Sequence, residues 1–384
     1  MIKVERAKAL YPFLLENLQL SPAEFILKNN KLGDDVQFAA SQLNGLRRAK
    51  KKLPSWFNND AILYPPNLNI EQSSSELTAN YKKQFFNGLK TSVDLTGGFG
   101  VDSWAIAQET ENHIYIEPND ALLEIVKSNF SELKIQNSKF NNQKAEDWLI
   151  QNHVVNAIYL DPSRRVEGQK KFKLDECVPD VVALQEIMLK RANKIIIKLS
   201  PLADLKAILS ELKGVAEIHV LAVKNEMKEV LVMQEKACDK ETQIHCVNFT
   251  TDNDKQEYSF KISEESQAEV KLSMVKDFIY EPNASILKAG AFKLVGLKFG
   301  LQKLHANTHL YTATHLIKDF PGKVFKLSDE RPKKVNVISR NHPMKPTQLA
   351  KKYKVKEGAL DDYLLAFRDI EKPKVHFAKQ INSL

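Results

Sequence analysis

A glycine-rich turn between a hydrophobic strand and a helix constrains the fold of this chain most strongly. The segment reads Thr-Ser-Val-Asp-Leu-Thr-Gly-Gly-Phe-Gly-Val-Asp-Ser-Trp over residues 91–104. Gly97, Gly98 and Gly100 allow backbone angles and close approaches that a Cβ would block. The free N–H groups at the start of the following helix point toward whatever lies above the strand end. In an open α/β sheet, such a turn is where nucleotide-like ligands bind.

Two classes of ligand compete for this turn. A dinucleotide turn has the pattern Gly-x-Gly-x-x-Gly, but counting from Gly98 the chain offers Gly98, Gly100 and then Ser103. Acidic residues flank the turn instead, Asp94 before it and Asp102 after it. Two carboxylates would repel a pyrophosphate and attract a cationic sulfonium group. The turn therefore favours a sulfonium ligand, and an ordinary structural turn remains the alternative.

Two further strand-like segments end in, or directly before, an acidic residue. Glu117 ends the segment 113–117, 17 positions after Gly100. Doubly wound nucleotide sites use an acid at about this distance to bind ribose hydroxyls, although Glu117 could instead cap the helix that begins near Asn119. Asp161 directly follows the segment 155–160 and opens Asp-Pro-Ser-Arg-Arg at 161–165. Three such strand ends are a more specific signal than any one of them.

The three strand ends together resemble the motifs of class I S-adenosylmethionine-dependent methyltransferases over about residues 85–235. The resemblance implies an α/β fold with a Rossmann-like seven-stranded sheet. The alternating pattern agrees with it, with strands expected at 91–96, 113–117, 136–141, 155–160, 194–199, 217–223 and 229–234. Helices are expected between them at 101–109, 119–132, 145–151, 180–192 and 202–212.

The same resemblance implies the residues that bind S-adenosylmethionine. The turn would hold the methionine end of the cofactor and Glu117 would hold the ribose. Asp147 follows the third strand, where methyltransferases commonly place an acid for the adenine amino group, although acids are ordinary at helix starts. Gln72 and Thr78 precede the first strand and could contact the cofactor, or belong to a helix start capped near Ser75. The full cofactor set is Asp94, Thr96, Gly97, Gly98, Gly100, Asp102, Glu117, Asp147, Gln72 and Thr78.

The segment Asp161-Pro162-Ser163-Arg164 is the candidate catalytic segment. It resembles the Asp/Asn-Pro-Pro-aromatic motif of enzymes that methylate exocyclic amino groups. Ser163 stands where that motif has its second proline, and Arg164 replaces the aromatic residue. Arginine can stack on a base or grip a phosphate, or it can pair with a nearby acid such as Glu167. The departure keeps open a second interpretation, a non-catalytic RNA-binding protein on a methyltransferase scaffold.

Positive charge is concentrated at the C-terminal end. Residues 278–384 contain 20 Lys and Arg against 9 Asp and Glu, a balance of +11, which leaves −3 for the rest of a chain whose net charge is +8. A separate basic module of this kind is typical of a polyanion-binding domain, although charge alone identifies no partner. The segment resembles the ferredoxin-like and THUMP-like domains appended to a group of bacterial methyltransferases, which implies tRNA or rRNA as the partner.

Length predicts two or three domains. The expected division is an N-terminal helical region (1–80), a methyltransferase domain (81–235) and a β-rich linker or subdomain (236–277). A ferredoxin-like domain (278–320) and an α+β THUMP-like domain (321–384) follow. The N-terminal helices are expected around Leu10–Leu18 and over 34–52.

The remaining sequence features point to a cytoplasmic protein. No stretch is long and apolar enough to span a membrane, the start lacks the apolar centre of a signal peptide, and Cys177, Cys238 and Cys246 form no disulfide pattern. His305, His309 and His315 suggest a metal site through His-x-x-x-His, but no third ligand at fixed spacing and no cysteine partner supports one, so a helix surface is expected there and no metal. The sequence predicts S-adenosylmethionine-dependent methylation of a base nitrogen in tRNA or rRNA. A nucleotide-dependent oxidoreductase is the more distant alternative because the third glycine is missing.

Overall fold

The chain divides into two compact units. The computed structural model describes residues 2–65, 67–151, 153–164 and 173–381. Unit 1 contains Met1–Val215 and Val232–Cys238, and unit 2 contains Ala216–Leu231 and Asp239–Leu384. Within the described ranges, no helix combines the length and the hydrophobicity needed to cross a membrane.

Unit 1 begins with a group of helices, two of which, α2 (Pro22–Lys28) and α6 (Glu76–Lys83), start at a residue whose side chain caps the helix. Ser21 accepts a hydrogen bond from the Glu24 backbone N–H and forms a capping box with that residue, while Ser75 accepts one from Thr78 N at 3.2 Å. The helices expected around Leu10–Leu18 and over 34–52 are present, as is the Ser75 cap. The elements are α1 (Ile2–Glu16), α2 (Pro22–Lys28), η1 (Asn30–Leu32), α3 (Asp35–Lys52), α4 (Pro54–Phe57), α5 (Asn67–Gln72), α6 (Glu76–Lys83) and η2 (Gln84–Phe86).

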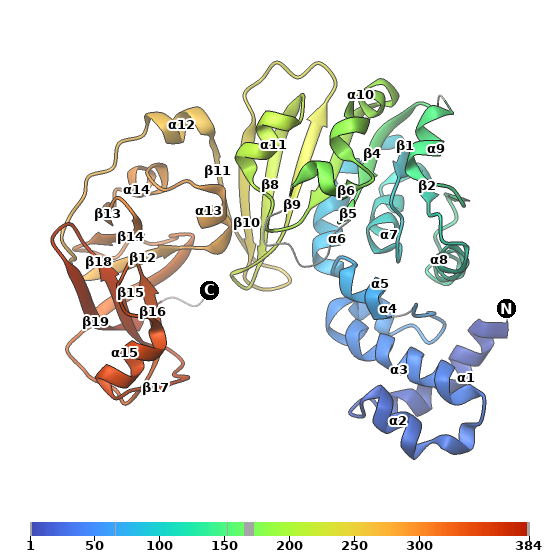
Figure 1. The fold of residues 1–384 in the computed structure, drawn as a ribbon, viewed down its shortest axis with the longest axis horizontal. Coiled ribbons are helices and arrows are strands. Elements are labelled where there is room, and N and C mark those ends of the chain that lie inside the picture. Colours follow the sequence, from blue (N-terminus) through green and yellow to red (C-terminus); the bar gives the residue numbers. More distant parts are fainter. Residues whose placement is uncertain (1, 66, 152, 165–172, 382–384) are drawn as a thin grey trace. The chain divides into compact units, whose positions relative to one another are not determined.

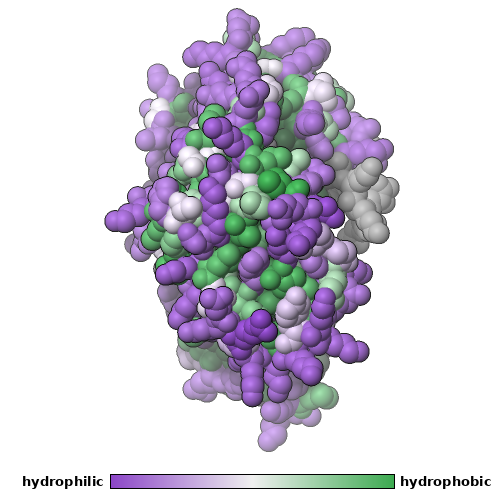
Figure 2. All heavy atoms as spheres, turned by 90° about the vertical axis from the view of Figure 1, so that its left-hand side faces the viewer, coloured by the Kyte–Doolittle hydropathy of each residue, from purple (hydrophilic) through white to green (hydrophobic). Residues whose placement is uncertain are grey.

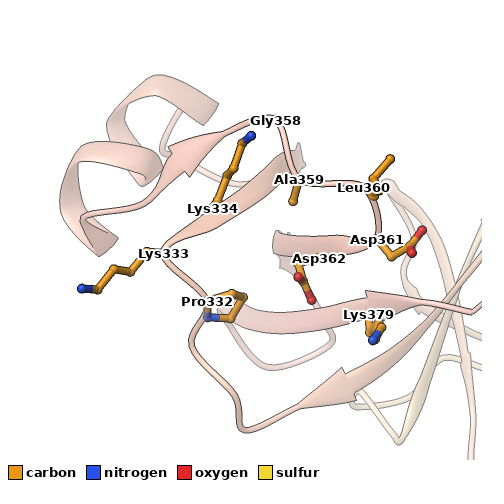
Figure 3. A pocket seen from close by; sticks show the side chains of 9 residues that line it. All are labelled: Pro332, Lys333, Lys334, Gly358, Ala359, Leu360, Asp361, Asp362 and Lys379. Atoms are coloured by element: carbon orange, nitrogen blue, oxygen red, sulfur yellow. The ribbon is translucent and has the colours of Figure 1, made fainter.

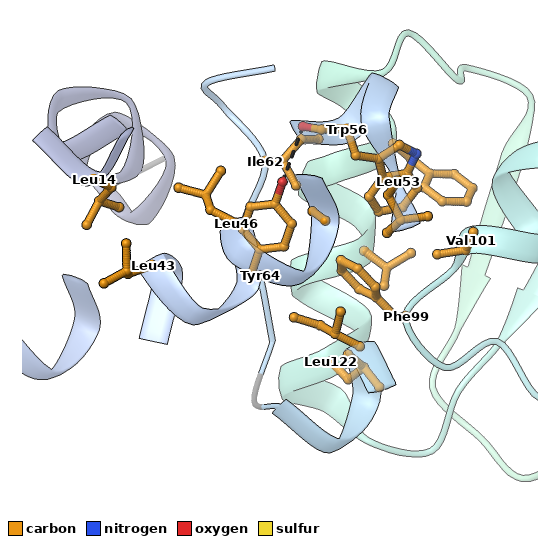
Figure 4. Close-up of a cluster of buried hydrophobic side chains, with 14 of the residues drawn as sticks. Leu14, Leu43, Leu46, Leu53, Trp56, Ile62, Tyr64, Phe99, Val101 and Leu122 are labelled. Carbon is orange, nitrogen blue, oxygen red and sulfur yellow. Dashed lines mark hydrogen bonds between the residues drawn. The ribbon is translucent and has the colours of Figure 1, made fainter. Parts of the chain in front are cut away.

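A shared hydrophobic core joins these helices to the glycine-rich turn (Figure 4). The Phe99 ring, within the turn, lies 5.0 Å from the Trp56 ring in an edge-on arrangement, and Trp104 meets Trp56 at 5.9 Å. The Tyr64 hydroxyl donates to Trp56 O, and Gln42 exchanges two hydrogen bonds with the Tyr64 backbone. The N-terminal helices are therefore part of the structure that supports the turn, and Figure 1 shows them gathered beside α7 and α8.

The central sheet has the strand order β11-β10-β8-β9-β7-β4-β1-β2-β3. Strands β1, β2, β3, β4 and β7 pair in parallel, as expected for strands joined through helices. All seven strands expected from the sequence are present, with small changes at their ends. They are β1 (Leu89–Asp94), β2 (Thr110–Ile116), β3 (Ser138–Asn141), β4 (Val155–Leu160), β7 (Ala192–Leu199), β8 (Val215–Val223) and β9 (Glu226–Glu235).

Helices alternate with these strands, and side-chain caps mark where most of them begin. Asn119, Asp180 and Asp204 each accept hydrogen bonds from N–H groups in the first turn of the helix that they precede. A short β-ribbon, β5 (Ser163–Arg164) with β6 (Cys177–Val178), and η3 (Leu174–Glu176) follow β4. The helices are α7 (Val101–Ala107), α8 (Asp120–Glu132), α9 (Ala145–Ile150), α10 (Val181–Arg191) and α11 (Leu205–Glu211).

The segment expected as a β-rich linker supplies two more strands to the sheet. β10 (Gln243–Phe249) pairs in parallel with β8, and β11 (Lys255–Lys261) pairs antiparallel with β10. The described part of the sheet is therefore two strands larger than the seven expected. The sequence predicted a β-rich segment here, but the pairing partner of its strands could not be predicted because an edge strand can pair with many others.

A second sheet, with eight strands, forms the rest of unit 2. Its order is β13-β14-β12-β15-β19-β18-β16-β17. His305 and His309 lie in β13 and β14 of this sheet, so the expectation of a helix surface for them was wrong. The strands are β12 (Phe278–Pro282), β13 (Gln302–His305), β14 (Thr308–Ala313), β15 (Gly322–Ser328), β16 (Lys334–Arg340), β17 (Lys356–Glu357), β18 (Asp362–Arg368) and β19 (Pro373–Gln380). The helices are α12 (Ile262–Gln267), α13 (Ala284–Ala289), α14 (Leu294–Lys298) and α15 (Pro346–Tyr353).

Candidate active site

The glycine-rich turn is closely packed on one side and open on the other. A Cβ on Gly97 would lie 2.2 Å from the Tyr115 ring, so only glycine fits there. Gly98 has φ +55°, and a Cβ added to it would meet only Thr96 O, at 3.6 Å. Gly100 is the residue before α7. The turn therefore fits tightly onto the sheet while its Gly98 side leaves room for another group.

The buried side chain of Asp94 stabilises this turn through hydrogen bonds. Its Oδ1 accepts from Thr96 N at 2.9 Å, and its Oδ2 accepts from Ser103 Oγ at 2.7 Å. Burial raises the pKa of Asp94 to about 7, against the lowering effect of these hydrogen bonds. Only 1% of the residue is exposed, so Asp94 shapes the turn and presents no surface to a ligand. Ser103, at the position of the missing third glycine, has a defined role as a donor to Asp94.

Glu117, just beyond β2, reaches the same turn. Its Oε2 accepts from Gly98 N at 3.0 Å, and its Oε1 accepts from Asn119 N at 2.9 Å. Burial raises the pKa of Glu117, although both hydrogen bonds oppose this shift. The side chain thus links the turn to the start of α8. It lies beside the turn, and it also accepts a hydrogen bond at the start of the helix, as the helix-capping alternative supposed. A carboxylate has about four acceptor sites, which leaves capacity for a ligand hydroxyl.

A buried network of charges lies under the start of α7. Asp102 Oδ1 contacts Lys82 Nζ at 3.0 Å, and Oδ2 accepts from Ser74 Oγ and Tyr159 OH, each at 2.7 Å. Lys198 Nζ lies 3.8 Å from Asp102 Oδ2. Burial would raise the pKa of Asp102, but Lys82 and Lys198 outweigh it and lower the pKa to about 2. Asp102 is therefore an anion held by two lysines, and its carboxylate faces the interior.

Asp161 connects this network to the glycine-rich turn. Its carboxylate forms an ion pair with Lys198, and its backbone N–H donates to Thr96 Oγ1 at 2.6 Å. Burial raises the pKa of Asp161, whereas Lys198 lowers it. One third of the side chain, 33%, is exposed. Thr96 also donates to Asp94, so Asp94, Thr96 and Asp161 form one chain of hydrogen bonds across the ends of β1 and β4.

The rest of the candidate catalytic segment is less fully described. Pro162 is buried and Ser163 is exposed, with its hydroxyl donating to Val178 O at 3.4 Å. Backbone pairing places Ser163 and Arg164 opposite β6. The Arg164 side chain, Arg165 and Glu167 lie outside the described residues, so the predicted stacking or phosphate contact stays a prediction.

Within the described part of the chain, three predicted cofactor residues form no hydrogen bond or ion pair with the turn. Gln72 ends α5 and is exposed, and Asp147 is exposed in the first turn of α9. Thr78 is buried, and its hydroxyl donates to Ser75 O at 3.2 Å within the first turn of α6. The geometry of Thr78 is that of a helix start, which was the alternative considered for it.

Sequence reasoning missed three members of the buried network: Ser74, Lys82 and Tyr159. Lys82 is fully buried and donates to Ser74 Oγ at 2.8 Å. A lysine near the end of an amphipathic helix ordinarily faces water, so nothing in the local sequence marked it. Tyr159 carried a weak signal, because it lies two residues before Asp161 and alternate residues of a strand share a face.

This arrangement can hold a ligand and a second reactant at one edge of the sheet. The open side of Gly98 and the carboxylate of Glu117 lie beside the turn, while Asp161 presents a partly exposed carboxylate at the end of β4. An anion in this position can orient an amino group or accept its proton. The cations of Lys82 and Lys198 are already paired with carboxylates, so neither is an independent site for a phosphate.

Exposed lysines form a second candidate surface in unit 2. Seven lysines of this unit, named below, are exposed and form no ion pair within the part of the chain that the structure describes. Hydrophilic side chains cover most of the face seen in Figure 2, with hydrophobic side chains gathered near its centre. We define this set as the lysine surface: Lys333, Lys334, Lys345, Lys351, Lys352, Lys354 and Lys356.

A shallow pocket of about 590 Å³ adjoins the lysine surface (Figure 3). Lys334 extends toward Gly358, where its Cε would lie 3.5 Å from an added Cβ. The lining mixes cations with the carboxylates of Asp361 and Asp362 and with Leu360, which is 91% exposed. The pocket is therefore electrostatically mixed, and two of its cations, Lys333 and Lys334, also belong to the lysine surface.

Comparison with known proteins adds independent information on the C-terminal part. The chain matches a family model for a ferredoxin-like domain over residues 278–321 and one described as THUMP domain-like over residues 320–379. A comparison with curated proteins gave no match.

Among solved structures, the chain is similar along its whole length to a putative methyltransferase from Porphyromonas gingivalis W83. The two are 28% identical, the TM-score is 0.87, and the match covers 98% of this chain and 99% of the other. Partial matches include an rRNA methylase from Streptococcus thermophilus (17% identity; 42% of this chain and 94% of the other). They also include SMU.1697c, a putative methyltransferase from Streptococcus mutans in complex with SAH (13% identity; 42% and 96%). Both partial matches have TM-scores of 0.31, too low to support an argument.

Proposed function

We propose that this chain, which has a class I methyltransferase fold followed by ferredoxin-like and THUMP-like domains, methylates a base nitrogen in tRNA or rRNA. The observation that carries the proposal is the position of Asp161. Its carboxylate is held by Lys198 and its backbone by Thr96, at the strand end next to the glycine-rich turn. The cytoplasm, where tRNA and rRNA are found, is the location we expect.

The turn fits S-adenosylmethionine as the methyl donor. A side chain on Gly98 would meet little, so the backbone offers an open surface for close approach. Glu117 supplies acceptor oxygens for ribose hydroxyls beside that surface. Asp94 would act indirectly, by holding the turn through Thr96 and Ser103. When bound, S-adenosylmethionine supplies an electrophilic methyl group on a sulfonium centre.

Alignment of the acceptor is the main task left to the protein. Positioning two reactants can contribute roughly 7–11 kcal/mol to lowering a barrier. Asp161 would accept a hydrogen bond from the amino group that is methylated and could take its proton. Lys198 would keep the Asp161 carboxylate in one orientation. Lys198 would itself be held in place by Asp102, which also pairs with Lys82. Pro162 and Ser163 would line the same edge, with Arg164 available for a base or phosphate.

The lysine surface is the proposed contact for the RNA backbone. Each phosphate contact releases counterions, so affinity should fall with rising salt. Lys351→Glu/Lys352→Glu should weaken RNA binding and reduce the salt dependence, because it removes two cations from exposed positions on α15. Lys206→Glu, which changes an exposed lysine on α11, is the matched control. Equal affinity of the double variant and the control would contradict this role.

Calorimetric titration with S-adenosylmethionine tests the cofactor site. Glu117→Ala should weaken binding at least tenfold, which corresponds to about 1.4 kcal/mol, because it removes the ribose acceptor beside Gly98. Asp147→Ala, at the exposed start of α9, tests the adenine contact in the same assay. Unchanged affinity of Glu117→Ala would refute the ribose role.

Turnover of the Asp161→Ala variant tests the catalytic role separately. This variant should bind S-adenosylmethionine as the wild type does, yet lose methyl transfer, because the carboxylate acts on the acceptor. An active variant would remove Asp161 from the mechanism. RNA binding without any turnover of the wild type would favour the alternative of an RNA-binding scaffold, which the Ser163 and Arg164 departures support.

A further inference from the structure

Two histidines and a glutamate meet on one face of the sheet in unit 2. Glu217 and His219 lie two residues apart on β8, so their side chains share a face. His245 lies on β10, directly opposite His219 in the parallel register. Among the residues that the structure describes, these three form the one group of at least three His, Cys, Asp or Glu side chains in which one ligand atom from each lies within 4.8 Å of the others.

The distances are close to those of a metal-ligand set. Glu217 Oε2 lies 2.8 Å from His219 Nε2 and 3.8 Å from His245 Nε2. Ligands about 2.0–2.1 Å from a tetrahedral Zn²⁺ are separated from each other by about 3.4 Å. These two distances lie on either side of that value, and one ligand atom from each of the three residues lies within 4.8 Å of the others. Modest side-chain rotations would therefore bring all three atoms to one ion.

The outer contacts of His245 suit a ligand role. Its Nδ1 lies 2.9 Å from Ser259 Oγ, and Ser259 stands opposite His245 in the β10–β11 pairing. Metal-binding histidines commonly donate their second ring N–H to such a partner, which orients the ring and leaves the other nitrogen for the metal. With Nδ1 donating to Ser259, the lone pair of Nε2 is directed into the cluster.

The cluster is shielded on one side and accessible on the other. The side chains of His219, His245 and Glu217 are 6%, 29% and 39% exposed. The two imidazole rings stack with centroids 4.4 Å apart and planes 15° apart. Chelation would turn the rings out of this stack, which the broad χ2 torsion of histidine permits. The exposed side leaves room for water as a fourth ligand.

We propose that Glu217, His219 and His245 bind one divalent cation of the Zn²⁺ class. Two imidazoles and a carboxylate are a set that Zn²⁺ favours, whereas Mg²⁺ and Ca²⁺ favour oxygen ligands alone. The ion would join β8 to β10. Spacing along the chain could not reveal this site, because His219 and His245 are 26 positions apart and come together only through strand pairing.

Metal titration of the full-length chain, without a histidine tag, tests the proposal. After removal of bound metal, Zn²⁺ competition against a chromophoric chelator should give one tight equivalent per chain, and Co²⁺ should give the absorption spectrum of a low-coordinate site. His245→Ala and Glu217→Gln should each lower Zn²⁺ affinity at least 100-fold. Ser259→Ala should lower it about tenfold or more, as expected for loss of an outer partner.

The control is His315→Ala, which removes an exposed histidine of the same unit that lies outside the cluster. It should bind Zn²⁺ as tightly as the wild type. Circular dichroism checks that each variant is folded. Glu217→Gln keeps the test valid if a histidine variant unfolds, because Glu217 is partly exposed and the change preserves the size of the side chain while replacing the carboxylate by a neutral amide. Less than one equivalent of Zn²⁺ in the wild type, or equal affinities for the folded Glu217→Gln variant and the control, would overturn the proposal.

Discussion

The buried pair of Lys82 and Asp102 gives the sharpest test of how unit 1 is held together. The Lys82 side chain is 0% exposed and the Asp102 side chain 9%, with their charged atoms 3.0 Å apart. Asp102→Asn keeps the shape of the side chain but leaves Lys82 and Lys198 without this anion. Removing one partner of a buried ion pair costs about 3–5 kcal/mol. We expect a loss of this size in the free energy of unfolding.

Lys82→Met complements that change by removing the cation while keeping an unbranched apolar chain. The double variant, with both changes, should lose less stability than the sum of the two single variants, because neither buried charge is then stranded. A coupling energy of about 1–3 kcal/mol is expected for groups in direct contact. The control is Lys83→Met. Lys83 pairs with Glu109 at 3.2 Å, and both side chains are partly exposed. Loss of this pair should therefore lower the free energy of unfolding by less than about 1 kcal/mol.

Urea unfolding followed by tryptophan fluorescence is the suitable assay. The three tryptophans of the chain, Trp56, Trp104 and Trp148, all belong to unit 1, so the signal reports on the unit that contains the pair. Strictly additive losses, or a loss from Asp102→Asn no larger than that of the Lys83→Met control, would refute the account of the buried network.

Three further predictions concern neighbouring residues. Burial raises the pKa of Asp94 to about 7 in the folded state, well above that of an exposed carboxyl group, so folding favours the protonated form. The folded wild type therefore binds this proton more tightly than the unfolded chain does, and its stability relative to Asp94→Asn should fall by about 3 kcal/mol between pH 5 and pH 8. Each pH unit over which only the folded state keeps the proton is worth about 1.36 kcal/mol. A pH-independent difference between the urea curves would contradict this. Gly97→Ala should cost about 1–3 kcal/mol, because its Cβ would lie 2.2 Å from the buried Tyr115 ring, and an unchanged thermal midpoint would show that the ring moves freely. Lys198→Met should shift the acidic limb of the pH–rate profile for methyl transfer to higher pH, because Lys198 lowers the pKa of Asp161; an unshifted limb would separate Lys198 from the active carboxylate.

The sequence predicted the architecture of the sheet well because that architecture depends on local patterns. The strand expected at 155–160 has the predicted bounds, while β1 and β2 end two residues and one residue earlier than the strands expected at 91–96 and 113–117. The whole-length structural match confirms the fold. The same match and the two C-terminal family models confirm the resemblance. The sequence predicted a β-rich segment at 236–277 but not that its strands β10 and β11 extend the sheet, because pairing depends on tertiary contacts.

The direction of individual side chains was harder to predict. Asp94 and Asp102 were expected to face a cationic ligand, yet Asp94 faces Ser103 and Asp102 faces Lys82 inside the protein. A strand-end acid looks the same in sequence whether its partner is a ligand or a buried side chain from another element. Lys82 is the clearest case, because none of its neighbours in the sequence indicates that this lysine is buried and pairs with Asp102.

The most direct test of the central claim is transfer of a labelled methyl group from S-adenosylmethionine to nucleic acid. Purified full-length chain would be incubated with RNA, DNA and protein pools from cells that lack the gene, so that the natural target is unmodified. The account predicts label in tRNA or rRNA, at a base nitrogen when the modified nucleotide is mapped, and no label with Asp161→Ala. Label in DNA or protein alone, or none in any pool with cofactor bound, would contradict methylation of RNA by this site.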